Sequence, residues 1–168
     1  SSQAGQSGTS IFDPVLCEIA YRWFCPAGGQ VLDPFAGGSV RGIIAAKLGR
    51  TYAGIDLRSE QAEANYAQAE VICQDCAADL QWAVGDALEV ARLLPGEYDL
   101  VFSCPPYADL ERYSADPRDL SIMEYEQFLD VYSTIIHDSC AMLKEDRFAV
   151  FVVGDVRDRA TGNYRNFV

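Results

Sequence analysis

Two short motifs contain most of the residues of this sequence whose types and spacing could form a binding or catalytic site. Residues 33–39 read Asp-Pro-Phe-Ala-Gly-Gly-Ser and follow the apolar pair Val31 and Leu32. Glycines between a strand and a helix let the backbone approach a ligand closely, and the N-terminus of the following helix attracts a carboxylate or a phosphate. A dinucleotide enzyme would show Gly-x-Gly-x-x-Gly, a pattern that is absent from the sequence. The first motif therefore predicts a close-fitting site for a ligand with an anionic group.

The second motif, Ser-Cys-Pro-Pro-Tyr at residues 103–107, ends the apolar run 98–102. Proline fixes φ and has no N–H to donate, so the carbonyl oxygens around Pro105 and Pro106 are left to accept hydrogen bonds. This motif predicts a site that receives donors from a substrate.

Apolar runs and turn residues predict the elements that position both motifs. Strands are expected at residues 31–33, 51–56, 80–84, 98–103 and 148–153, with helices at 14–25, 40–48, 59–72 and 87–94 and a long helix whose apolar residues extend from Tyr125 to Leu143. Strands that alternate with helices form a doubly wound, mainly parallel α/β sheet, which binds ligands beyond the carboxyl ends of its strands. Four polar residues fall at or just after such ends: Asp33, Asp56, Asp86 and Ser103. We therefore expect them to belong to one site.

Helical spacing also predicts which helix faces are apolar. The first helix is expected to begin with Asp13 as N-cap and Pro14 as its first residue. Its predicted apolar face comprises Val15, Leu16, Ile19, Ala20 and Trp23. Ser121 and Glu124 stand in capping-box register before the long helix. The predicted apolar side of that helix comprises Tyr125, Phe128, Leu129, Tyr132, Ile136 and Leu143.

The two motifs, in this order, resemble those of class I S-adenosylmethionine-dependent DNA amino-methyltransferases of the N4-cytosine and N6-adenine type. The resemblance covers roughly residues 10–168 and implies the Rossmann-like fold of that family, with S-adenosyl-L-methionine as cofactor. It implies cofactor contacts from Phe12 and Asp13 before the first helix, from Asp33, Pro34, Phe35, Ala36, Gly37 and Ser39, from Asp56 and Leu57 at the ribose, from Asp86 and Ala87 at the adenine, and from Ser103. It implies a catalytic site of Ser103, Cys104, Pro105, Pro106 and Tyr107.

In that family a polar side chain and a neighbouring carbonyl of the second motif accept hydrogen bonds from the target amine. The aromatic residue, here Tyr107, stacks on the base, a contact that contributes about 1–3 kcal/mol. Cys104 stands where the family has Asp, Asn or Ser, and a thiol is a poorer acceptor. The nucleophile of cytosine-ring methylases follows a Pro-Pro pair, whereas Cys104 precedes it. We therefore expect Ser103 or main-chain carbonyls to take the acceptor role, with no covalent step at Cys104.

The charge of the chain opposes a nucleic-acid partner. The 25 acidic and 13 basic residues give a net charge of −12, and through residue 60 there are five of each, so the whole excess lies after that point. Polyanion binding requires a basic surface. If DNA is the partner, we expect a further segment or a partner subunit to supply it. The strand pattern ends at the fifth strand, where such folds usually add two more. We therefore expect either a truncated domain or a catalytic half that needs another segment.

Other features narrow the remaining possibilities. We expect one catalytic domain at residues 10–168 after a flexible lead at 1–9, in a cytoplasmic protein with no membrane segment. The pair Cys73 and Cys76 lacks the two further ligands of a zinc site, so no metal is expected. His137 is expected to be structural, and Arg112, Tyr113 and Arg118 form either a lid or a plain surface loop. Two alternatives to DNA methylation remain: methylation of a small-molecule or protein amine, and a cofactor-binding module without activity.

Overall fold

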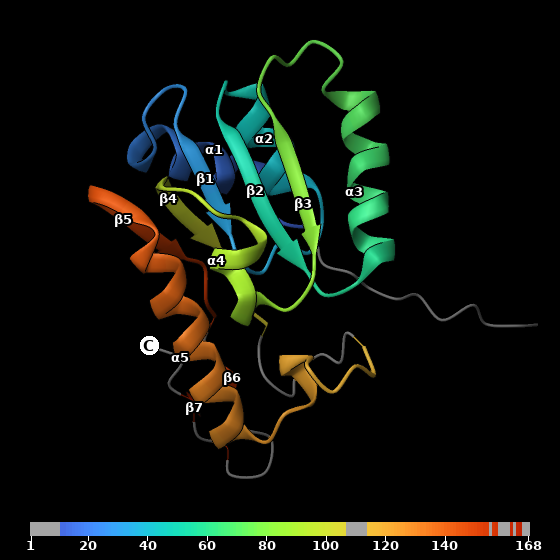
Figure 1. The fold of residues 1–168 in the computed structure, drawn as a ribbon, viewed down its shortest axis with the longest axis vertical. Coiled ribbons are helices and arrows are strands. Elements are labelled where there is room, and N and C mark those ends of the chain that lie inside the picture. The colour runs from blue at the N-terminus through green and yellow to red at the C-terminus, as the bar shows by residue number, and fades with distance from the viewer. Residues whose placement is uncertain (1–10, 107–113, 155, 158–161, 163, 166–168) are drawn as a thin grey trace, which may run out of the picture.

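The computed structural model describes residues 11–106, 114–154, 156, 157, 162, 164 and 165 (Figure 1). Its elements are α1 (Pro14–Phe24), β1 (Gln30–Asp33), α2 (Val40–Lys47), β2 (Thr51–Asp56), α3 (Ser59–Ile72), β3 (Leu80–Val84), η1 (Ala87–Glu89), α4 (Val90–Leu93), β4 (Tyr98–Ser103), η3 (Leu120–Ile122), α5 (Tyr125–Ala141), β5 (Leu143–Phe151), β6 (Val156–Arg157) and β7 (Tyr164–Arg165). No described helix has the length and apolar character needed to cross a membrane.

The five long strands form one parallel sheet in the order β3-β2-β1-β4-β5. The chain winds outward from β1 to β3 and then returns to place β4 on the other side of β1. The strand order thus reverses between β1 and β4, where doubly wound folds bind ligands. The predicted fold class is confirmed. The short strands β6 and β7 form a separate antiparallel pair.

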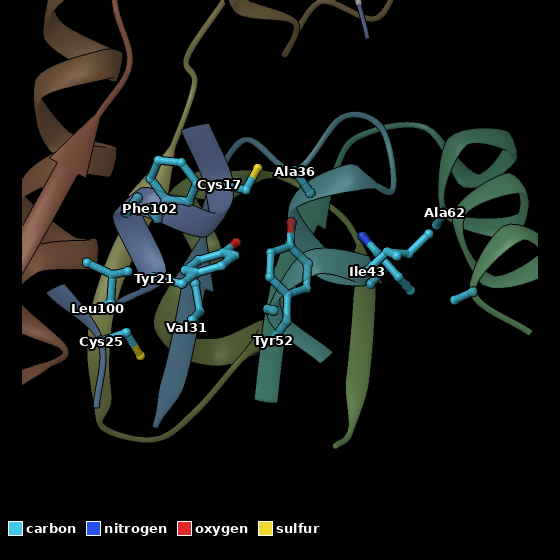
Figure 2. Close-up of a cluster of buried hydrophobic side chains, with 14 residues drawn as sticks. Cys17, Tyr21, Cys25, Val31, Ala36, Ile43, Tyr52, Ala62, Leu100 and Phe102 are labelled. Carbon is cyan, nitrogen blue, oxygen red and sulfur yellow. The ribbon is translucent and has the colours of Figure 1, made fainter. Parts of the chain in front are cut away.

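Alternating side chains of the central strands build a hydrophobic core on each face of the sheet. Val31 belongs to a core that also contains residues of α1, α2 and α3 (Figure 2), whereas its neighbour Leu32 belongs to a core that contains residues of α4 and α5. In β4, Phe102 joins the first core and Val101 the second. Helices therefore cover both faces, and the ends of β1 and β4 are held rigidly between two packed layers.

The structure corrects the predicted face of α1. Asp13 caps the helix as expected, but Val15, Leu16, Ile19 and Trp23 are exposed, and the buried face comprises Cys17, Ala20 and Tyr21. The physical reason lies in Tyr21, whose hydroxyl donates to the carbonyl of Arg41 at 2.8 Å and whose ring meets that of Phe102 edge to face at 5.3 Å. Apolar spacing could not reveal that this polar anchor selects the face.

The segment after the long helix also differs from expectation. The helix α5 ends at Ala141, so Leu143 begins β5, which starts five residues before the predicted strand and ends at Phe151. A shift in the β4–β5 register accommodates the extra residues, with Asp146 at φ 55°. The capping box is not formed either: Glu124 is the N-cap of α5 without a side-chain bond, and Ser121 lies in η3.

Candidate functional site

The predicted site residues gather at the carboxyl edge of the sheet. Asp33 ends β1, Asp56 ends β2, Ser103 ends β4, and Asp86 lies two residues beyond β3. The glycine loop, residues 34–39, connects β1 to α2 beside these strand ends. This is the edge and the point of strand reversal at which the fold class binds its ligands.

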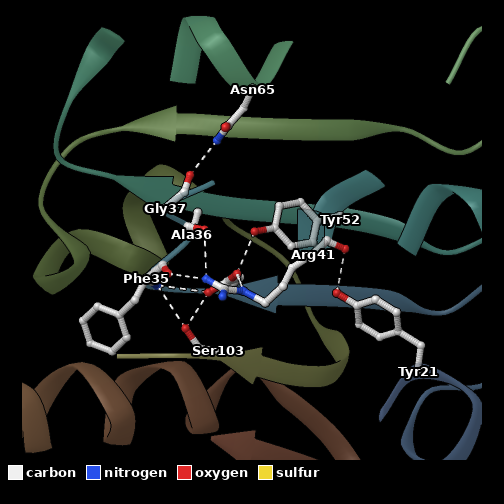
Figure 3. A network of polar contacts seen from close by, with 9 residues as sticks. Tyr21, Phe35, Ala36, Gly37, Arg41, Tyr52, Asn65 and Ser103 are labelled. Atoms are coloured by element: carbon white, nitrogen blue, oxygen red, sulfur yellow. Dashed lines mark hydrogen bonds and ion pairs between the residues drawn. The ribbon is translucent and has the colours of Figure 1, made fainter. Parts of the chain in front are cut away.

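The carboxylate of Asp33 is fully buried and accepts hydrogen bonds from Phe35, Arg41, Tyr52 and Ser103, the four donors labelled in Figure 3. Its Oδ1 accepts from the Ser103 hydroxyl at 2.5 Å and from the backbone N–H of Phe35 at 3.2 Å. Its Oδ2 accepts from Nε of Arg41 at 2.6 Å and from the Tyr52 hydroxyl at 2.7 Å. All of these partners belong to the protein. Asp33 therefore supports the glycine loop from below, and its buried carboxylate offers no exposed surface to a ligand.

Ser103 is equally buried, which changes the role expected for its hydroxyl. The hydroxyl donates to Asp33 and accepts from the N–H of Phe35 at 3.3 Å, while the Ser103 carbonyl accepts from the N–H of Val152 at 2.9 Å. An amine would have to displace these partners to reach the side chain. In this geometry Ser103 joins β4 to the glycine loop, and the expected acceptor role shifts toward the carbonyls beyond it.

Arg41 is the largest part of the site that the sequence reasoning missed. It is 5% exposed, and its Nη2 donates to the carbonyls of Phe35 at 2.6 Å and Ala36 at 2.8 Å. Its guanidinium lies 4.7 Å from the ring centroid of Phe12, which places the segment before α1 beside the loop. The available signal was a charged residue one position into an otherwise apolar helix. Asp13 caps α1 through the N–H of Val15, and its expected contact with a cofactor stays a prediction.

A row of amide side chains on α3 holds the other side of the loop. Asn65, which is 1% exposed, donates from Nδ2 to the Gly37 carbonyl at 2.7 Å and accepts from Gln61 at 3.0 Å. The Ser39 hydroxyl donates to Gln68. The spacing of Gln61, Asn65 and Gln68 places them on one helix face. Three amides at this spacing in an alanine-rich helix were the signal that could have identified them.

This arrangement leaves the start of α2 without a side-chain cap. Ser39 occupies the N-cap position, yet its hydroxyl turns to Gln68 and makes no capping bond. Uncapped amide groups at a helix N-terminus attract a ligand carboxylate. A Cβ atom added at Gly37 or Gly38 would meet nothing within 4 Å, so space is open above the loop, and Gly37 has a φ of 50° that favours glycine.

Asp56 lies across the loop from α2, at the end of β2. Its Oδ1 accepts from the backbone N–H of Arg58 at 2.9 Å and from Nε of the same arginine at 3.3 Å. Burial raises the pKa of Asp56 above its usual value, against the opposing effect of hydrogen bonds from Arg58 and from the backbone of Gly37. Leu57, the next residue, is half-buried. Desolvation therefore disfavours the charged form of Asp56, and the hydrogen bonds to its carboxylate favour that form.

The expected adenine-binding residues form a helix entry after β3. Asp86 is the N-cap of η1, and its Oδ1 accepts from the N–H of Leu88 at 2.9 Å; Ala87 is buried. The capping bond holds the start of η1, and the contact of Asp86 with adenine stays a prediction. Pro34 and Ala36 are also buried, and the half-buried Phe35 stacks on Tyr132 with ring centroids 6.2 Å apart.

The second motif leaves β4 directly beside this loop. Cys104 and Pro106 are half-buried and Pro105 is buried. The Cys104 thiol lies near enough to Tyr132 to contribute, after burial, to raising the pKa of that phenol. Tyr107, the expected stacking residue, lies outside the described residues, as do Arg112 and Tyr113.

Other expected features can be placed as well. Arg118 pairs with Asp116 at 2.7 Å on the surface, and His137 is exposed beside Asp138. Among the described residues, no group of three or more His, Cys, Asp or Glu side chains could hold a metal ion.

Comparison with known proteins finds likeness in structure alone. No protein-family model matches the sequence, and no curated protein matches it. TrmN from Thermus thermophilus superposes with a TM-score of 0.67 at 20% identity, over 85% of this chain and 39% of that chain. TehB from Haemophilus influenzae gives 0.59 at 15% identity, over 85% and 41%. A SAM-dependent methyltransferase from Agrobacterium tumefaciens gives 0.58 at 15% identity, over 82% and 42%.

This chain therefore spans about two fifths of the length of these three proteins. At such identities the likeness establishes the fold. The chain has the Rossmann-like fold found in S-adenosylmethionine-dependent methyltransferases, with the glycine loop and Asp56 at the carboxyl edge of the sheet.

Proposed function

We propose that the chain is an S-adenosylmethionine-dependent methyltransferase that methylates an exocyclic amino nitrogen of adenine or cytosine in DNA. The observation that carries this proposal is the open space at Gly37 and Gly38, in a glycine loop that leads into the uncapped start of α2 and is fixed by buried polar contacts. An anion-binding helix end and a carboxylate, held on either side of an open glycine loop, fit a ligand that has a carboxylate at one end and a ribose further along.

The described residues fit the cofactor in the following way. The first amides of α2 would bind the methionine carboxylate, Asp56 would accept hydrogen bonds from the ribose hydroxyls, and the segment of Asp86 and Ala87 would contact the adenine. When bound, S-adenosylmethionine supplies a methyl group on a reactive sulfonium. The protein must then align an amine with that methyl group, and this step needs position more than a nucleophile.

The second motif supports the amine substrate. The Asp33–Ser103 hydrogen bond of 2.5 Å fixes the end of β4 against the glycine loop, so the chain beyond Ser103 begins at the edge of the proposed cofactor site. Pro105 and Pro106 have no N–H groups, so the carbonyls there are suited to accept hydrogen bonds from an amino group. Tyr107 would stack on a base rotated out of its helix. The choice of a DNA base as the substrate is supported by the resemblance of the two motifs more than by the fold.

The acidic charge favours a second candidate. A net charge of −12 suits a small-molecule or protein amine better than DNA, because polyanions are bound by basic surfaces. On the DNA reading, a further segment or a partner subunit supplies that basic surface. A binding module without activity is the third reading.

Incubation with S-adenosylmethionine carrying a labelled methyl group separates these readings. The reactions contain duplex DNA, single-stranded DNA, small primary amines or a bacterial protein extract, and the DNA is digested to nucleosides for chromatography. We expect label in N6-methyladenine or N4-methylcytosine. Label confined to an amine or a protein would support the second candidate and overturn the first, and no label in any acceptor despite cofactor binding would support the third.

A further inference from the structure

We propose that Arg41 is a positioning residue for the cofactor, because its guanidinium sets the orientation of the peptide unit that faces Asp56. This inference rests on the proposed function, since it takes the ligand of the glycine loop to be S-adenosylmethionine. Arg41 lies beneath the loop and is buried by protein, so it acts through the loop rather than by touching the ligand (Figure 3).

The contacts of Arg41 reach the end of β1, the glycine loop that follows it, and Phe12 before α1. Its Nε donates to Asp33 at the end of β1 at 2.6 Å, and its Nη2 donates to the loop carbonyls of Phe35 at 2.6 Å and Ala36 at 2.8 Å. The face of the guanidinium covers the ring of Phe12 at 4.7 Å. One side chain therefore holds the strand end, the loop and the segment before α1 in a fixed relation.

The decisive step is the geometry of one peptide bond. In a planar trans peptide the C=O and the following N–H point in opposite directions. Because the Ala36 carbonyl points inward to Arg41, the N–H of Gly37 points away from Arg41. The backbone of Gly37 is among the hydrogen-bonding groups that act to lower the pKa of Asp56. The guanidinium thus fixes a hydrogen-bond donor of the carboxylate proposed to bind the ribose.

The shape of arginine suits this task. The planar guanidinium presents donors in several fixed directions and also stacks on an aromatic ring, whereas a lysine ammonium is a single point charge. At this site the guanidinium donates hydrogen bonds to one carboxylate and two carbonyl oxygens at the same time. A lysine could keep the charge opposite Asp33, but it could not hold both carbonyls and cover Phe12. Arg41→Lys therefore removes the positioning while it keeps the net charge.

A second buried arginine provides a matched control. Arg50 is 8% exposed and also donates to two main-chain carbonyls, those of Leu48 at 2.7 Å and Cys25 at 2.8 Å. It lies just before β2, at the end of that strand opposite Asp56. Loss of this guanidinium should lower stability without altering the glycine loop. If the role of Arg41 were purely structural, its substitution would affect stability and ligand affinity in the same way as the substitution of Arg50.

The test measures two quantities for the full chain and its variants. The affinity for S-adenosylhomocysteine is measured by calorimetry at a temperature well below each Tm, and the thermal midpoint Tm is measured by melting. We expect Arg41→Lys and Arg50→Lys both to lower Tm. Arg41→Lys should weaken binding about tenfold or more, as expected for a misplaced recognition group, and Arg50→Lys should leave the affinity within about twofold of the parent protein. Affinity unchanged by Arg41→Lys, or reduced equally by both variants, would overturn the inference.

A double-mutant cycle adds a readout that stability alone would not move. If Arg41 acts through Asp56, the losses of affinity from Arg41→Lys and Asp56→Asn should be less than additive, whereas independent effects would add and would contradict this route. Should Arg41→Lys fail to fold, Arg41→Gln combined with Asp33→Asn removes both buried charges together and avoids an orphaned carboxylate. This pair should also bind at least about tenfold more weakly, and parent-like affinity would overturn the inference.

Failure of the inference differs from failure of the proposed function. If the parent chain does not bind S-adenosylhomocysteine at all, the proposed function is wrong and the inference falls with it. If the parent chain binds and Arg41→Lys binds equally well, the inference alone is wrong.

Discussion

Replacing Asp56 by asparagine should separate ligand binding from folding. Burial raises the pKa of Asp56, so the protonated carboxyl is favoured more in the folded chain than in the unfolded one. The contribution of a group with a raised folded pKa is fully present below the unfolded pKa and is lost as the pH rises through the folded pKa. As the pH rises through the folded pKa, ionisation of Asp56 therefore lowers the stability of the ligand-free protein, and we expect Asp56→Asn to leave Tm unchanged or higher at pH 7.5.

Ligand binding should respond in the opposite direction. The charged carboxylate of Asp56 would accept hydrogen bonds from the ribose, and a hydrogen bond to a charged group contributes about 1.5–3 kcal/mol. At 1.4 kcal/mol for each factor of ten, Asp56→Asn should weaken S-adenosylhomocysteine binding by about 10-fold to 150-fold. In the parent protein affinity should also fall as the pH drops toward the raised pKa of Asp56, and Asp56→Asn should lose this pH dependence.

Calorimetric titration between pH 5 and 8, paired with thermal melting, measures both effects. Asp99→Asn is the control, because Asp99 is also a buried carboxylate of the sheet but lies near the start of β4, where it pairs with Lys144 and Arg147. This variant should lose stability and keep its affinity for S-adenosylhomocysteine. A folded Asp56→Asn protein that binds as tightly as the parent at neutral pH would refute the assignment of Asp56 to the ribose.

Four further predictions follow from the loop and the second motif. Asn65→Ala removes the 2.7 Å hydrogen bond to the Gly37 carbonyl. This change should weaken S-adenosylhomocysteine binding in calorimetry by about 3-fold to 10-fold, the effect of a single hydrogen bond. Unchanged affinity would show that the bond from α3 does not position the loop for the ligand. Gly38→Leu places a side chain in open space, so it should leave Tm within a few degrees while it blocks binding, and a variant that still binds would show that the space is not the ligand site. Cys104→Ser should retain methyl transfer, since the thiol is not needed as a nucleophile; a covalent DNA adduct that this variant abolishes would contradict that role. Tyr107→Ala should impair methyl transfer to DNA while S-adenosylhomocysteine affinity stays within about threefold, and equal losses in both assays would argue against base stacking.

Local sequence signals predicted the parts of the fold that local chemistry determines. Asp13 and Pro14 begin α1 as their helix-start preferences indicate. The fully buried β4 follows from its apolar sequence. The positions of Asp33, Asp56 and Ser103 at strand ends, and hence their meeting at one edge, followed from the alternation of strands and helices.

Features determined by distant contacts were not predictable in this way. The buried face of α1 depends on the bond from Tyr21 to the Arg41 carbonyl, across 20 positions of sequence. Asp33 was expected to touch the cofactor, but its partners Tyr52 and Ser103 come from two other strands and surround it completely. A motif shows which residue types occur together, and it does not show whether a polar side chain points to the ligand or to the interior.

The early start of β5 has a similar cause. Lys144, Asp146 and Arg147 give a polar sequence that does not resemble a strand. Two of these side chains bind Asp99 on β4, at 2.8 Å from Lys144 and 3.0 Å from Arg147, and these ion pairs hold the polar segment against its neighbour. Tertiary pairing thus overrides the local preference.

Titration of the chain with S-adenosylhomocysteine by isothermal calorimetry determines whether the glycine loop and Asp56 form a cofactor site. We expect one binding site per chain with an affinity in roughly the micromolar range, typical of enzyme ligands. S-adenosylmethionine should displace the product analogue, and NAD should not, because the glycine loop lacks the dinucleotide pattern. A folded protein that binds neither S-adenosylhomocysteine nor S-adenosylmethionine at millimolar concentration would show that this edge of the sheet is not a cofactor site.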